Sequence, residues 1–204
     1  MNTGQVINSD EFKKCVDFHG HLCPGLSIGY KASKAAMAWL EENRAADEEI
    51  VAIVETDACS ADAIQVVTGC TFGKGNFIFK DYGKMALTLF SRKTGRGVRV
   101  VRRPGDLSQN KPDSDLFQKI RNGEAGENEK SRFNELRLKQ CRDMLEMPDN
   151  ELFVIDPVQI KPPPAARVEA SELCDKCKEP TMKTKLSLVD GKKMCRGCIE
   201  QSPC

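Results

Sequence analysis

Two cysteine pairs near the C-terminal end of the chain place the strongest constraint on its structure. Cys174 and Cys177 are separated by two residues, a gap of 17 residues follows, and Cys195 and Cys198 repeat the same spacing. Two thiolates at this spacing bend around one metal ion as a knuckle, and two knuckles complete the tetrahedron that zinc prefers. The sequence therefore predicts a structural zinc site built from these four cysteines.

The residues between the two pairs predict how this module folds. Residues 186–189, followed by Asp190 and Gly191, are typical of a β-hairpin. Knuckle, hairpin and a short helix from Cys198 follow one another in the order of a treble-clef finger. A module of about 40 residues has too little core to fold alone, so metal binding is expected to provide much of its stability. Two alternatives stay open: two disulfide bonds, or replacement of one ligand by Cys204, Asp175 or Asp190.

The role of this finger is less constrained than its structure. Seven cations make it basic, which would suit contact with nucleic acid: Lys176, Lys178, Lys183, Lys185, Lys192, Lys193 and Arg196. The finger has no tryptophan, tyrosine or phenylalanine on which bases could stack. Contact with a protein, or stabilisation of a dimer, is an equally good interpretation.

Length and composition describe an ordinary chain apart from its thiols. The 204 residues allow one domain plus a small module at about 100–200 residues per domain. The net charge of +1 argues against chain-wide attraction to nucleic acid or membrane. No apolar run approaches the ~20 residues that span a bilayer, and residues 1–4 lack the features of a signal peptide. We expect a cytoplasmic protein, in which ten cysteines serve metal sites or chemistry rather than disulfides.

The segments before the finger predict an α+β domain. Helices are expected at 10–18, from Pro24 to about Glu42, from a cap at Asp57 to Gly69, at Asp113–Ile120 and at Arg132–Leu145. Strands are expected at Glu49–Glu55, Asn76–Asp81, Met85–Arg92, Val98–Arg103 and Glu151–Ile155. The middle three strands follow one another without long helices, which favours antiparallel pairing. A run of three prolines, 162–164, indicates a stiff linker, so the domains are predicted as 1–160, a linker at 161–170 and the finger at 171–204.

The two histidines of the chain lie together in this first domain. His19, His21 and Cys23 alternate along an extended segment and so point to one side. Cys23 precedes one predicted helix, and Cys59 falls in the first turn of the next, where the helix dipole favours a thiolate. Three protein ligands with one open position are typical of catalytic zinc. The alternative is that both histidines only satisfy backbone groups in a tight turn.

This interpretation leaves several assignments open. Which imidazole binds is undecided, and Cys23 is either a ligand or a neighbouring thiol. Asp57, Asp62 and Lys80 are candidates for orienting ligands or transferring protons. Cys70 is expected to be a small buried residue, and Cys15 and Cys141 to belong to the core. The glycine-flanked segment 71–76 is expected to be a turn that brings Lys74 or Asn76 to the rim of the site.

Three ordered blocks, at residues 18–25, 57–63 and 68–76, resemble the signature of the FmdE-like family, which is named after molybdenum formylmethanofuran dehydrogenase. Residues 81–84 and the terminal finger are similar to the two-domain form of that family. The resemblance implies an α+β core of thioredoxin-like layout, with a mixed sheet flanked by helices, and then a treble-clef domain. It also implies a metal site around the His-Gly-His block and Cys59.

The residues and the resemblance together favour one function over two others. The leading hypothesis is a dimeric zinc protein that acts as an accessory or catalytic subunit in one-carbon redox metabolism, with redox-enzyme subunits as partners. The sequence has no cluster-type cysteine run for iron–sulfur binding. The first domain also lacks the C-x-x-C pair of thioredoxin chemistry. The alternatives are a metal-handling protein, and a regulator whose finger binds nucleic acid or protein.

Overall fold

The computed structural model describes residues 6–104, 114–161, 163–166 and 169–200. The chain forms two compact units, Met1–Ala165 and Ala166–Cys204. Among the described residues, no helix combines the length and the apolar character needed to cross a membrane.

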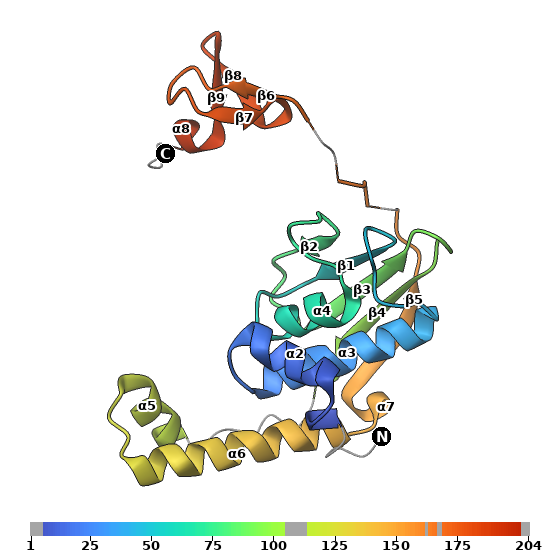
Figure 1. The fold of residues 1–204 in the computed structure, drawn as a ribbon, viewed down its shortest axis with the longest axis vertical. Coiled ribbons are helices and arrows are strands. Elements are labelled where there is room, and N and C mark those ends of the chain that lie inside the picture. The colour runs from blue at the N-terminus through green and yellow to red at the C-terminus, as the bar shows by residue number, and fades with distance from the viewer. Residues whose placement is uncertain (1–5, 105–113, 162, 167–168, 201–204) are drawn as a thin grey trace. The chain divides into compact units, whose positions relative to one another are not determined.

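A mixed sheet of five strands forms the centre of the first unit (Figure 1). Its order is β2-β1-β3-β4-β5. The strands are β1 (Ile50–Val54), β2 (Phe77–Phe79), β3 (Ala86–Ser91), β4 (Gly97–Arg102) and β5 (Phe153–Val158). The predicted antiparallel pairing is right for β3 and β4. It is wrong for β2, which pairs with β1 in parallel because helix α4 (Ser60–Thr68) carries the chain back before β2 begins.

Two further helices pack with α4 to complete the main core. They are α2 (Asp10–His19) and α3 (Pro24–Leu40). One face of α3, from Ile28 to Leu40, is buried against the apolar side chains that β1, β3 and β4 direct toward it. A second cluster, which includes Phe12, Leu26 and Val67, joins α2, α3 and α4. The structure is therefore the expected α+β fold with a mixed sheet flanked by helices.

Local capping residues set most of these helix ends as the sequence predicts. Pro24 occupies the first turn of α3, and Gly69 ends α4 in the left-handed conformation at φ 73°. The predicted cap at Asp57 is wrong, because α4 begins at Ser60 with Cys59 as its N-cap. The Thr56 hydroxyl accepts a hydrogen bond from the Ala58 N–H, so a local turn holds the residues before the helix.

The chain between β4 and β5 forms helices α5 (Ser114–Asn122), α6 (Glu127–Glu146) and α7 (Asp149–Leu152). Helix α6 begins five residues before the predicted start at 132, since the Glu129 carboxylate accepts the Gly126 N–H as a cap. Its last turns bury Cys141, Met144 and Leu145, and its first turns lie beside α5 (Figure 1). The predicted break at 104–112 lies almost entirely outside the described residues.

The predicted last strand at 151–155 is shifted toward the C-terminus. Helix α7 includes the first two of those residues, and β5 then runs to Val158. Pro157 therefore belongs to the sheet, where β5 is the edge strand and tolerates a residue without an N–H donor.

The second unit consists of two short hairpins and one helical turn. Strands β6 (Ser171–Leu173) and β7 (Pro180–Met182) pair antiparallel, as do β8 (Leu186–Val189) and β9 (Lys192–Cys195). Residues 183–185 form a 3-10 turn between the hairpins, and α8 (Arg196–Ile199) follows β9. Asp190 and Gly191 connect β8 to β9 with φ values of 48° and 75°, which confirms the predicted hairpin.

Candidate metal centres

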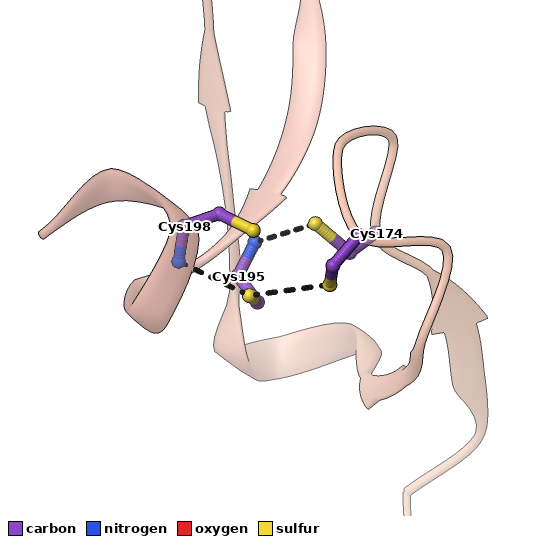
Figure 2. A group of neighbouring side chains, drawn as sticks. Cys174, Cys195 and Cys198 are labelled. Carbon is purple, nitrogen blue, oxygen red and sulfur yellow. Dashed lines mark hydrogen bonds between the residues drawn. The ribbon is translucent and has the colours of Figure 1, made fainter. Parts of the chain in front are cut away.

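The four cysteines of the second unit converge on one point. Their sulfur atoms all lie within 4.8 Å of one another. Cys177 Sγ and Cys195 Sγ are 3.9 Å apart, and a tetrahedron with Zn–S bonds of about 2.3 Å has sulfur–sulfur edges of about 3.8 Å. Figure 2 shows Cys174 directed across the cluster toward Cys195 and Cys198. Four thiols in this arrangement form a zinc-type metal site.

Backbone donors prepare this cluster for a cation. The Cys195 N–H donates to Cys174 Sγ at 3.3 Å, and the Cys198 N–H donates to Cys195 Sγ at 3.4 Å. The N–H groups of Cys195 and then of Cys177 lower the pKa of Cys174 to about 6. Because the thiolate is the form that binds metal, Cys174 is ready to coordinate at neutral pH.

The structure also brings together the histidines and cysteine of the first unit. His19 is the last residue of α2, Gly20 reverses the chain at φ 88°, and Cys23 caps α3 with its Sγ accepting the Leu26 N–H. Donor atoms of His19, His21 and Cys23 lie within 4.8 Å of one another. His19 Nε2 is 3.7 Å from Cys23 Sγ. The two imidazole rings have centroids 4.5 Å apart.

A carboxylate orients one of these imidazoles. His19 Nδ1 lies 2.7 Å from Asp62 Oδ2, which is contributed by the first turn of α4. This contact holds the proton on Nδ1 and leaves Nε2, the nitrogen that faces Cys23, free of a proton. The tautomer matters because a metal binds only the deprotonated nitrogen. Asp62 thus has the position expected of a residue that supports a metal ligand.

Cys59 lies next to this cluster rather than inside it. A hydrogen bond with Cys59 and its charge contribute to the pKa of Cys23, which burial above all raises to about 11. The two thiols approach because α3 carries glycines where it meets α4. A Cβ atom at Gly25 would lie 3.1 Å from the Cys59 Cβ, and one at Gly29 would lie 2.4 Å from the Ser60 carbonyl oxygen.

Helix α6 adds a charged residue that the sequence analysis missed. Desolvation, the charge of His19 and then the charge of Arg137 lower the pKa of His21. A lowered pKa keeps this exposed imidazole neutral and able to bind a metal at neutral pH. Arg137 is 116 residues away in the chain, and no local spacing relates it to the histidines.

The other residues that the sequence analysis singled out have different positions. Asp57 and Lys80 are exposed and make no described contact with the cluster. Cys70 is buried and donates to the Ile50 carbonyl, as expected of a small core residue. Cys15 and Cys141 are also buried, in agreement with the prediction.

Lys74 and Asn76 do not reach the rim of the site. Both donate to the Asp47 carbonyl, and Asn76 also donates to the Ile50 carbonyl. They lie at the amino ends of β1 and β2, whereas Cys59 follows the carboxyl end of β1. The prediction that they line the site is therefore wrong, although the predicted turn is present, with the Gly75 N–H donating to the Phe72 carbonyl.

Fold and donor clusters together define an α+β metal-binding protein with a small C-terminal zinc finger. More particularly, the chain belongs to the FmdE family. The family model described as "FmdE, Molybdenum formylmethanofuran dehydrogenase operon" matches residues 18–154, which confirms the resemblance seen in the sequence.

Two relatives place the chain within this family. A solved FmdE-like protein of tungsten formylmethanofuran dehydrogenase from Syntrophus aciditrophicus is 26% identical, with a TM-score of 0.64, and covers 98% of this chain and 97% of its own. A protein of Archaeoglobus fulgidus named "Probable S-adenosyl-L-methionine-binding protein" is 37% identical over 189 residues, or 89% of this chain. The chain spans 50% of the length of that relative.

Proposed function

We propose that this protein binds two zinc ions and acts as an accessory or catalytic subunit in one-carbon redox metabolism. One ion is structural and is held by the finger cysteines. The other is reactive and is held by the His19–His21–Cys23 cluster. The observation that carries the proposal is the convergence of these three donors within 4.8 Å, with Asp62 bound to His19.

The donor set of the first unit suits such an ion. Two imidazole nitrogens and a thiolate are ligands that zinc accepts, and three protein ligands leave a position for water or substrate. A zinc ion there would polarise a carbonyl group or lower the pKa of a bound water. Cys59 either completes the coordination or remains a thiol beside it. His21 is exposed, so a small substrate can approach the cluster from solvent.

The link to one-carbon chemistry rests on the family. The names of the family model and of the Syntrophus protein both refer to formylmethanofuran dehydrogenase. We extend this association to the present chain, together with redox-enzyme subunits as partners and a second copy of the chain in a homodimer.

Metal content per chain tests the two-site proposal. We expect two zinc ions in the wild-type protein by elemental analysis, one in Cys23→Ser and one in Cys177→Ser. Cys70→Ala is the control, because Cys70 is buried away from both clusters, and it should retain two. A wild-type protein with one ion, lost completely in Cys177→Ser, would leave the finger as the metal site and overturn the proposal.

Asp62 gives a second test with a graded effect. Asp62→Asn is expected to weaken zinc binding at the first unit by about 10- to 100-fold, because the amide no longer holds the proton on His19 Nδ1. Competition with a chromophoric chelator measures this affinity, and the finger ion should be unaffected. Asp57→Asn is the matched control, since Asp57 is exposed and lies outside the cluster. Equal affinities in Asp62→Asn and wild type would remove Asp62 from the site.

Metal handling is a second candidate function, and the exposure of His21 favours it. A partner could reach and remove an ion held by an exposed ligand. In that case the first unit should release its ion rapidly and reversibly to a chelator while the finger retains its own. Slow release from both sites would favour catalysis.

The Archaeoglobus relative suggests a ligand to test alongside the metals. Its name attributes S-adenosylmethionine binding to that protein, and we propose the same binding for this chain as a subsidiary candidate. Equilibrium dialysis against S-adenosylmethionine, with methionine and adenosine as controls, measures it. Equal retention of all three compounds would count against specific binding.

A further inference from the structure

The region between α5 and α6 contains a pocket that neither metal centre explains. It has a volume of about 280 Å³ and opens to solvent. Ile120 and Ala125 contribute apolar surface from the end of α5 and the following loop. Lys130, Phe133 and Arg137 contribute from α6, at a spacing that places them on one helical face. The pocket thus combines apolar surface with two cationic groups.

Arg137 is the group in this pocket best suited to bind a ligand. Its guanidinium donates to Asn134 Oδ1 at 3.1 Å. No ion pair to Arg137 occurs among the described residues. Lys130, by contrast, pairs with Glu127 at 2.8 Å. A guanidinium without a carboxylate partner can accept an oxyanion through two parallel hydrogen bonds.

Two aromatic rings lie beside this guanidinium. Arg137 sits over the Phe133 ring, 5.8 Å from its centroid. The Phe117 ring of α5 lies 6.4 Å from Phe133 between centroids, and Phe117 is 42% exposed. An apolar body packed on these rings would exclude water from the guanidinium and strengthen its contact with an anion.

Helix α6 also relates this pocket to the histidine cluster. Arg137 lies in the pocket and is also close enough to His21 to affect its pKa. One turn further along α6, the buried Cys141 lies close enough to Cys23 to affect its pKa. A ligand on Arg137 is therefore held within the charged surroundings of His21.

We propose that the α5–α6 pocket binds an amphipathic oxyanion, with the carboxylate or phosphate on Arg137 and the apolar body against Phe133. This site is separate from the proposed metal function, because none of its lining residues is a metal donor. Binding therefore does not require an ion at the first unit.

Four small molecules separate the parts of this proposal in calorimetric titrations of the full-length protein. The probes are 2-naphthoate, naphthyl phosphate, 2-naphthol, which lacks the anion, and acetate, which lacks the apolar body. We expect wild-type protein to bind at least one naphthyl anion and to bind 2-naphthol and acetate at least tenfold more weakly. A preference between naphthoate and naphthyl phosphate identifies the anion.

Variants then assign the binding to Arg137. Arg137→Gln is expected to weaken the naphthyl anion by about 10- to 100-fold, as expected for loss of a charged hydrogen-bond donor. Arg142→Gln is the matched control, since Arg142 is exposed on the same helix and does not line the pocket. Arg137→Lys keeps the charge without the fork of donors and should bind with intermediate affinity, which guards against an unfolded Arg137→Gln protein.

Three results would overturn the proposal. The first is a wild-type protein that binds neither naphthyl anion. The second is equal affinity in wild type, Arg137→Gln and Arg137→Lys. The third is a wild-type dimer that Arg137→Gln dissociates, which would assign the pocket to contact with a second copy of the chain.

Discussion

Substitution of Cys174 by serine is expected to unfold the second unit and leave the first intact. The unit has two short hairpins and a single helical turn, and among its described residues only Cys174 and Cys198 are buried. Structural zinc sites contribute roughly 10–16 kcal/mol to folding in small modules. Loss of one ligand therefore removes the main stabilising interaction of residues 171–200.

Two independent signals measure this effect. Amide resonances of residues 171–200 should lose their chemical-shift dispersion, and the metal content should fall by one ion per chain. Fluorescence of Trp39, the one tryptophan of the sequence, reports on α3 and should stay unchanged. Ser187→Ala, an exposed change on β8, is the control and should leave both signals as in wild type. A folded, metal-free Cys174→Ser module would contradict the structural role of the ion.

Substitution of Gly29 by alanine is expected to destabilise the first unit by about 1–3 kcal/mol, the range for overpacking a tight core. A Cβ atom at this position would lie 2.4 Å from the Ser60 oxygen and 2.6 Å from the Ser60 Cα. These are backbone atoms and cannot rotate away, so α3 and α4 must separate. Alanine also gains about 1 kcal/mol of helix propensity over glycine, but that gain does not relieve the clash.

Urea unfolding followed by Trp39 fluorescence measures the loss of stability. The matched control is Gly73→Ala, because a Cβ atom at Gly73 would meet nothing within 4 Å, and its stability should equal that of wild type. Since Cys59 immediately precedes Ser60, the shift of α4 should also weaken metal binding at the first unit. A Gly29→Ala protein as stable as Gly73→Ala would show that the helices can separate without cost.

The same contact shows why the sequence described the helices better than their arrangement. The pattern of α3, with Pro24 at its start and an apolar face beyond, is local and predicts a helix. Nothing in that pattern shows that Gly29 faces Ser60, because the approach of two helices depends on both surfaces. The position of β2 was missed for a related reason: pairing in parallel with β1 depends on how α4 packs, and the residues of β2 do not encode it.

The candidate site divides in the same way. His19, His21 and Cys23 could be grouped from their spacing alone, because four residues of chain keep them close however the domain folds. Asp62 could be nominated only as one of several carboxylates, until packing of α2 against α4 placed it on His19. Arg137 gave no signal, since its relation to His21 exists only where α6 folds back on the domain.

What the sequence by itself determined is therefore short in range. It specified the four finger cysteines, the hairpin between them and the capped ends of α3 and α4, because these depend on spacing within a few residues or on ligands that one ion gathers. The tertiary structure alone decided which carboxylate orients His19, where Cys59 lies relative to Cys23, and which cation lies near His21. Each of these requires two or more elements to pack, and packing reflects the shape and burial of all their side chains together.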